Sequence, residues 1–206
     1  MRDNALLHKG SIMRLPLLLA AVFSASTAFA QAGLWSHVSP QAGPRNLAPA
    51  TLSDAQLKSV AHLLRQQQPD EIWDCEGADL EEMIKGLRFE SIPLAGKQEL
   101  VLAEAPAGCA RGGQGANGAM WIIRFDGDAP ALLTTPKDFS GWLFSIQPTL
   151  SHGYPDIVLG WHMSAFESNL SYFRFDGKSY HLIGTASLQA DDQENEKIVP
   201  TPHSPE

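Results

Sequence analysis

The sequence predicts an α+β protein in which two duplicated antiparallel β-meander units form a twisted sheet or a partly closed barrel, with one N-terminal helix packed on it. The phrase Arg-Phe-Asp-Gly occurs twice, at 124–127 and 174–177, each time after a run rich in aromatic and β-branched residues. An acidic residue and an apolar triplet precede each copy, at 99–102 and 156–159. Asp-Gly between alternating apolar residues is a strong hairpin signal, so the repetition indicates a duplicated unit.

Residues 1–30 are expected to be a secretory signal peptide. Arg14 precedes an apolar run, and Ala28-Phe29-Ala30 forms a small-x-small cleavage site. The run is shorter than the roughly 20 residues that span a bilayer, so we expect no membrane span in the mature chain. The protein is therefore expected to be periplasmic or secreted after cleavage near Ala30. The sequence leaves open whether translation starts at Met1 or at Met13.

Residues 31–52 are rich in proline and small residues, which predicts an irregular leader from which Trp35 docks onto the domain. A helix is predicted over 53–68, because Ser53 and Gln56 occupy the positions of a capping box. Its apolar residues recur at helical spacing, at Leu57, Val60, Ala61 and Leu64. A second, short helix is predicted from Asp79 to Lys85.

The two β units, about 89–134 and 142–183, belong to a single predicted domain of residues 53–188. In the first hairpin the return strand is predicted at 131–134, and Pro130 places it at a sheet edge because proline donates no ladder hydrogen bond. A two-residue turn in the second hairpin would set Phe175 opposite Lys178 and Phe173 opposite Tyr180. One face would then carry Phe173, Phe175, Tyr180 and Leu182.

The charge balance argues against two classes of partner. The formal net charge is -8, and removing residues 1–30 takes away three basic residues and one acidic residue, leaving 12 basic and 22 acidic, or -10. Such a chain is poorly suited to nucleic acid or to anionic membrane surfaces. Residues 189–206 are acidic, with three prolines among 195–206 and few apolar side chains, which predicts a disordered tail.

Cys75 and Cys109 are the two cysteines of the chain. In an oxidising compartment an even pair is typical of a disulfide, here closing a loop worth about 3–4 kcal/mol in the chain-entropy model. Two buried free thiols are the alternative.

The acidic residue and the arginine of each unit are candidate partners across neighbouring strands: Glu99 with Arg124, and Asp156 with Arg174. A structural salt bridge at the sheet surface is one interpretation, and it would contribute less than about 1 kcal/mol if exposed. A ligand-binding carboxylate is the other.

Two loops are candidate contact surfaces for a ligand or partner. The glycine-rich loop of residues 105–118 has backbone freedom to turn N–H groups outward, but it lacks the Gly-Lys-Ser/Thr ending of a phosphate-binding loop. Its counterpart in the second unit covers 161–168. Because binding residues concentrate on loops, the predicted contact residues are Arg111, Gln114, Asn117, Trp161, His162 and Glu167.

The segment Gly153–His162 resembles the end of an FG-GAP or VCBS-type β-propeller repeat, where a glycine, a Pro-Asp pair and an apolar strand follow one another. In that family an Asp-rich loop before the motif binds calcium. The matching positions here, 150–152 and 94–97, carry no carboxylate, so calcium binding is not implied. The order of motifs from Cys109 to Gly177 more closely resembles a group of exported bacterial proteins of unknown function, which implies location and no activity.

No catalytic set is found, since the chain has no Gly-x-Ser-x-Gly and no His-x-x-x-His. We predict no cofactor and no metal site. The favoured function is a periplasmic or secreted binding or inhibitor protein, whose partner is a protein or a cell-wall component of the envelope. The alternative is an envelope hydrolase whose residues meet only in the fold, from His152, Asp156, His162 and Glu167.

Overall fold

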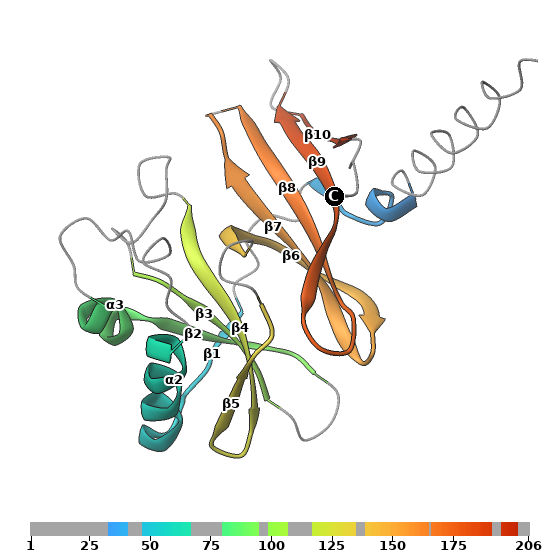
Figure 1. Cartoon of the computed structure of the whole chain (residues 1–206). Coiled ribbons are helices and arrows are strands. Elements are labelled where there is room, and N and C mark those ends of the chain that lie inside the picture. The colour runs from blue at the N-terminus through green and yellow to red at the C-terminus, as the bar shows by residue number, and fades with distance from the viewer. Residues whose placement is uncertain are drawn as a thin grey trace, which may run out of the picture.

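The computed structural model describes residues 33–40, 47–66, 80–94, 99–106, 117–134, 139–164, 166–190 and 195–201. These residues form a mostly antiparallel β-sheet with few helices, as the sequence predicts (Figure 1). The ten described strands follow the order β1-β2-β3-β4-β6-β7-β8-β9-β10, and β5 pairs with β4 beside this path. The sheet is open, because β1 and β10 are its two ends.

The first half of the sheet carries two helices on one face (Figure 1). The helices are α2 (Asp54–Gln66) and α3 (Leu80–Gly86). The strands are β1 (Ala48–Pro49), β2 (Arg88–Ile92), β3 (Glu99–Glu104), β4 (Gly118–Asp126) and β5 (Ala129–Leu132).

The second half is a five-stranded antiparallel meander: β6 (Ser140–Ser151), β7 (Tyr154–His162), β8 (Glu167–Phe175), β9 (Tyr180–Ala190) and β10 (Glu196–Thr201). It joins the first half through two residue pairs, Gly118 with Gly141 and Ala119 with Ser140. Gly141 has a φ of 121°, and a Cβ there would lie 2.0 Å from the Gly160 carbonyl oxygen. The crossing between the halves therefore requires glycine at this position.

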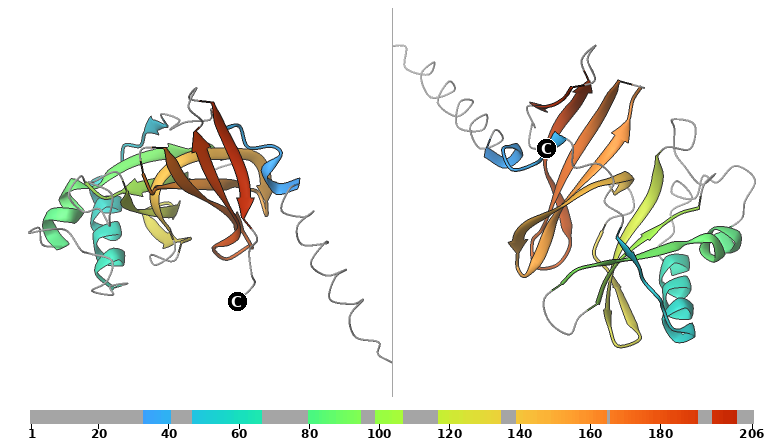
Figure 2. Two further views of the ribbon diagram at one scale, coloured as in Figure 1. Left: turned by 90° about the horizontal axis from the view of Figure 1, so that it is seen from above. Right: turned by 180° about the vertical axis from the view of Figure 1, so that it is seen from behind.

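Buried apolar side chains form three successive layers. One cluster lies between the helices and the first half, and includes Leu64, Trp121 and Phe125. A second fills the space between the two halves. The third covers the outer face of the second half, where Trp35 and Val38 pack on the strands. Figure 2 shows the helices and this N-terminal segment on opposite sides of the molecule.

The predicted first helix and its capping box are confirmed. The Gln56 N–H donates to Ser53 Oγ at 3.1 Å, and the Ser53 N–H donates to Gln56 Oε1 at 2.9 Å. Val60, Ala61 and Leu64 are buried, whereas Leu57 is 41% exposed and lies outside the core.

The two hairpins differ from the prediction in register. Gly127 and Asp128 form the first turn, so Ala129 pairs with Asp126 and the return strand is 129–132. Pro130 does lie on an edge strand, because β5 pairs with β4 alone.

The second turn has four residues, not two, because Asp176 Oδ1 accepts hydrogen bonds from the N–H groups of Lys178 and Ser179. Phe175 therefore faces Tyr180 rather than Lys178, and Phe173 faces Leu182 rather than Tyr180. The predicted face survives this shift, since a change of two residues preserves the side-chain alternation. Phe173, Phe175, Tyr180 and Leu182 all belong to the cluster between the halves.

The predicted docking of Trp35 is confirmed, whereas the predicted disordered tail contains a strand. Trp35, 4% exposed, packs edge-on against Tyr172 with ring centroids 5.6 Å apart. In the segment expected to be a disordered tail, residues 196–201 form β10 and pair with β9 over six positions. Ile198, which packs against the outer cluster, gives this strand an apolar anchor.

No helix among the described residues is long and apolar enough to cross a membrane. Cys75 and Cys109 lie outside the described residues, so their predicted disulfide stays a prediction.

Candidate functional site

Three of the six predicted contact residues meet where β7 ends and β8 begins. Asn117 hydrogen-bonds to His162, and His162 and Glu167 line one pocket. Trp161 is half-buried, and because side chains alternate along a strand it faces away from His162. Arg111 and Gln114 lie outside the described residues.

Asn117 holds the backbone of His162. Its side-chain Nδ2 donates to the His162 carbonyl at 3.1 Å, and its Oδ1 accepts from the His162 N–H at 2.8 Å. The first β6–β7 pair is Trp142 with Gly160, because β6 turns to β4 at residues 140 and 141. The Asn117 amide therefore takes the place of a strand partner, and it is itself fully buried.

The His162 ring is held by two further contacts. It stacks on Trp142, with centroids 5.1 Å apart and planes at 16°, and its Nδ1 lies 3.2 Å from Ser168 Oγ. Trp142 can lie against β7 because residue 160 is glycine: a Cβ there would meet the indole at 2.4 Å. The histidine is thus exposed to solvent yet fixed in orientation.

The connection after His162 presents two large apolar side chains to solvent. Met163 is 58% exposed and Phe166 is 73% exposed. Their backbone is tied down, since the N–H of Met163 donates to the Glu167 carbonyl and the N–H of Ala190 donates to the Phe166 carbonyl, at 3.0 and 3.1 Å. Two large apolar side chains, held at the surface by backbone hydrogen bonds, make this connection a candidate contact surface.

A pocket of about 140 Å³ opens beside this hairpin. Its lining combines the aromatic side chains of Trp142, His162 and Phe166 with two acidic residues, Glu167 and Glu196, and with small or aliphatic residues such as Ser168. Small-molecule pockets usually enclose about 300–1,000 Å³, so this one is sized for a single side chain. A more open hollow of about 330 Å³ adjoins it and shares Ala190 and Glu196. We call the residues that line the 140 Å³ pocket, together with Met163, the His162 surface.

The sequence alone missed Trp142, Phe166 and Glu196 as members of this surface. Phe166 could have been found, because an apolar aromatic residue in a predicted loop has no core to enter. Trp142 had the signature of an ordinary strand residue. Glu196 belongs to the segment that composition assigned to a disordered tail, so no local signal placed it near His162.

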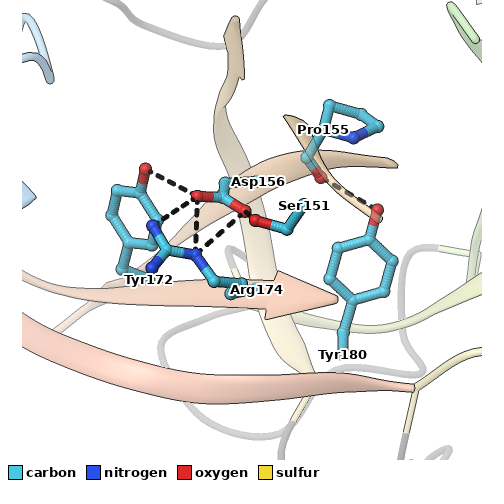
Figure 3. A network of polar contacts seen from close by, with 6 residues as sticks. All are labelled: Ser151, Pro155, Asp156, Tyr172, Arg174 and Tyr180. Carbon is cyan, nitrogen blue, oxygen red and sulfur yellow. Dashed lines mark hydrogen bonds and ion pairs between the residues drawn. The ribbon is translucent and has the colours of Figure 1, made fainter. Parts of the chain in front are cut away.

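The predicted pair of Asp156 and Arg174 is confirmed, and it is partly buried rather than superficial (Figure 3). Arg174 approaches the carboxylate to 2.8 Å, and the hydroxyls of Tyr172 and Ser151 donate to it at 3.2 and 3.0 Å. Asp156 is 0% exposed. Burial and the neighbouring Asp156 raise the pKa of Tyr172 to about 12. Each donor satisfies a buried carboxylate, which is a structural role.

The other predicted pair, Glu99 with Arg124, does not form. Glu99 accepts a hydrogen bond from Gln56 of α2, and Arg124 donates to the hydroxyl of Tyr154, both at 3.4 Å. No ion pair found within the described part of the chain joins the two.

Of the four residues suspected of forming a hydrolase site, only His162 and Glu167 lie together, in the pocket lining. His152 lies at the turn before β7, next to Phe175, whereas His162 ends the same strand. Asp156 and His162 are six residues apart on β7, or about 20 Å at ~3.3 Å per residue. This version of the hydrolase hypothesis therefore lacks an assembled site.

A surface cluster of Ser179, His181 and Asp176 also fails as a catalytic triad. Ser179 Oγ and Asp176 Oδ2 both lie 3.0 Å from the same nitrogen, Nε2 of His181. A triad needs the acid and the nucleophile on opposite ring nitrogens. Among the described residues, no three His, Cys, Asp or Glu side chains gather as a metal would require.

Comparisons with protein-family models, with curated proteins and with solved structures give no match to this chain. Its function is therefore argued from the residues of the His162 surface.

Proposed function

We propose that the chain is an exported protein, periplasmic or secreted after cleavage near Ala30, which binds a partner protein of the cell envelope through the His162 surface. Its expected mode of action is that of a binding or inhibitor protein. The signal-peptide pattern of residues 1–30 supports the location.

The observation that carries this proposal is the exposure of Met163 and Phe166 on a hydrogen-bonded hairpin. Burying these side chains against a partner would remove apolar surface from water at little cost in backbone entropy, because backbone hydrogen bonds already hold residues 163 and 166. Phe166 lines the same pocket as the stacked rings of Trp142 and His162, so these rings extend its surface. Aromatic residues in such positions are typical of binding hot spots.

A partner protein fits the pocket better than a free small molecule does. At about 140 Å³ the pocket alone encloses too little volume to bury most of a small ligand's surface, and the adjoining hollow of about 330 Å³ is the more open of the two. A protein can combine one inserted side chain with contacts to the exposed hairpin around it. A cell-wall component is the other class of partner that the proposed location allows.

We also infer that the two halves of the sheet contain copies of one meander. In each unit, β2 to β5 and β6 to β9, four strands that are consecutive in the chain pair as antiparallel neighbours. In both units the third strand ends within the phrase Arg-Phe-Asp-Gly. Related chains whose two units differ at every one of these positions would contradict a common origin.

The test is capture of a partner from an envelope extract of the source organism by the immobilised mature protein. Phe166→Ser should abolish the capture, because it removes the most exposed apolar side chain of the surface. Leu150→Ser is the matched control, since Leu150 is 58% exposed but lies at the opposite end of β7, paired with Pro155.

Equal recovery of every bound protein by the wild type and by both variants would overturn the proposal. Recovery of wall fragments, in place of a protein, by the wild type and the Leu150→Ser variant would assign the surface to a cell-wall component instead.

A further inference from the structure

We propose that the pocket of the His162 surface receives a cationic side chain, lysine or arginine, of the partner protein. This inference rests on the proposed function and specifies the chemistry of the same site. Its basis is the combination of pocket size, lining charge and aromatic walls.

Two acidic residues line the pocket, whereas Lys197 lines only the adjoining hollow. Glu167 and Glu196 both face the pocket, whose lining includes no lysine and no arginine. Neither side chain makes an ion pair or a side-chain hydrogen bond with any other described residue. By contrast Glu81, Glu104 and Asp156 each pair with an arginine. The pocket thus offers two carboxylates to an incoming cation.

The two carboxylates come from separate strands. Glu167 begins β8, and Glu196 begins β10, where it pairs with Ala190 at the end of β9. Pairing of β10 with β9 is what brings Glu196 to the site. Because both acids line one pocket, an ammonium or guanidinium group is favoured there over a neutral group.

The aromatic lining suits the rest of such a side chain. Trp142, His162 and Phe166 line the same pocket, and the Trp142–His162 stack fixes two of these rings. Lysine and arginine carry long apolar stems below a charged head, so the stem can pack on rings while the head meets carboxylates. An arginine head can also stack on an aromatic face.

The whole chain favours a basic partner as well. The formal net charge of -8, or -10 without residues 1–30, would speed the approach of a positively charged surface. This long-range attraction acts before the pocket is filled, and it weakens as salt is added.

The test uses NMR titration of the mature protein with Nα-acetyl-arginine amide and Nα-acetyl-lysine amide. Nα-acetyl-norleucine amide is the control, because it has a similar stem and no charge. The two cationic probes should shift the Trp142 indole and His162 ring resonances in a saturable way, and added salt should weaken the effect. Equal shifts from the norleucine probe, or no shifts from any probe, would overturn the proposal.

Variants locate the interaction. Glu167→Gln combined with Glu196→Gln should weaken binding of the cationic probes by roughly three- to tenfold, as expected for two solvent-accessible ion pairs. Asp126→Asn is the control, since Asp126 is an exposed acid at the end of β4 in the other half of the sheet. An equal loss in the control would show general charge attraction and contradict a built pocket.

The titration and the partner capture can distinguish failure of the cationic pocket from failure of the proposed function. If Phe166→Ser abolishes capture while the double glutamine variant and the wild type capture equally, the surface stands and the cationic pocket is wrong. If the probes bind as expected but the Phe166→Ser variant captures as much partner as the wild type, the cationic pocket is supported and the proposed function is wrong.

Discussion

The two halves of the sheet use similar strands but are covered and held together differently. In the first half, α2 and α3 bury one face under a conventional helical layer. In the second half the outer face is covered by a short N-terminal segment around Trp35 and by the polar network of Asp156. The second half also presents the His162 surface, at the end of β7 away from that network.

A difference of one residue in register explains why Asp156 pairs with Arg174 but Glu99 does not pair with Arg124. Glu99 pairs with Phe125 across β3 and β4, so it shares the helix-covered face of that phenylalanine, and Arg124 lies on the opposite face. In the second half Ile157 pairs with Phe173, so the next position brings Asp156 beside Arg174. A one-residue shift changes the face of every side chain, so the same motif on two pairs of strands does not guarantee the same contacts.

The largest expected effect comes from removing the cover of the second half. Trp35→Ala should lower the free energy of unfolding by about 3–5 kcal/mol, because it leaves a cavity over Tyr172. Urea denaturation followed by circular dichroism measures this change. A loss below about 1 kcal/mol would show that the N-terminal segment does not stabilise this half.

The next test compares the two arginines directly. Arg174→Met should cost about 2–3 kcal/mol, since it leaves a buried carboxylate with two hydroxyl donors and no counter-ion. The value lies below that of a fully buried pair because the Arg174 side chain is 42% exposed. Arg124→Met should cost less than about 1 kcal/mol, as it loses one long hydrogen bond to Tyr154.

Equal costs for the two substitutions, measured by urea denaturation under the same conditions, would remove the distinction between the halves.

A smaller effect is expected in the helical cover of the first half. Ser53→Ala removes the side-chain acceptor of the Gln56 N–H and should cost about 1 kcal/mol. Ser53→Asn is the matched control, because asparagine can cap the same N–H, and it should retain most of the stability. Thermal unfolding of both variants measures the difference, and an equal loss in both would contradict a capping role.

Alkaline pH should act on the second half, which contains all three tyrosines of the chain. The pKa of Tyr172 is raised to about 12, so folding favours its protonated form. Its contribution to stability is complete below the unfolded pKa of about 10 and is lost as pH rises through 12. Tyr172→Phe should flatten the fall of stability over that range in pH-dependent denaturation. An unchanged slope would contradict the assignment.

Much of the fold could be predicted because its signals are local. The capping box of Ser53 and Gln56, the edge position of Pro130 and the inward face of Phe173 and Phe175 each depend on a few neighbouring residues. The second turn was misjudged because the Asp176 side chain captures two backbone N–H groups, which the Asp-Gly pattern does not encode.

The candidate site was predicted only in part, because it depends on contacts between distant segments. Asn117 and His162 were chosen separately from two loops, and only the fold joins them, 45 residues apart. Strand β10 was missed because its acidic composition outweighed Ile198, whose partner Leu188 lies on another strand. Because β10 was not predicted, Glu196 was not predicted as part of the site.

The central claim is that the chain meets its partner at the His162 surface. Site-directed photo-crosslinking tests it most directly, with benzoylphenylalanine placed at position 166 or, as the control, at position 150, where Leu150 is also an exposed apolar side chain. The account predicts one specific crosslinked protein from position 166 in the envelope and none of that species from position 150. The same product from both positions, or from position 150 alone, would contradict it.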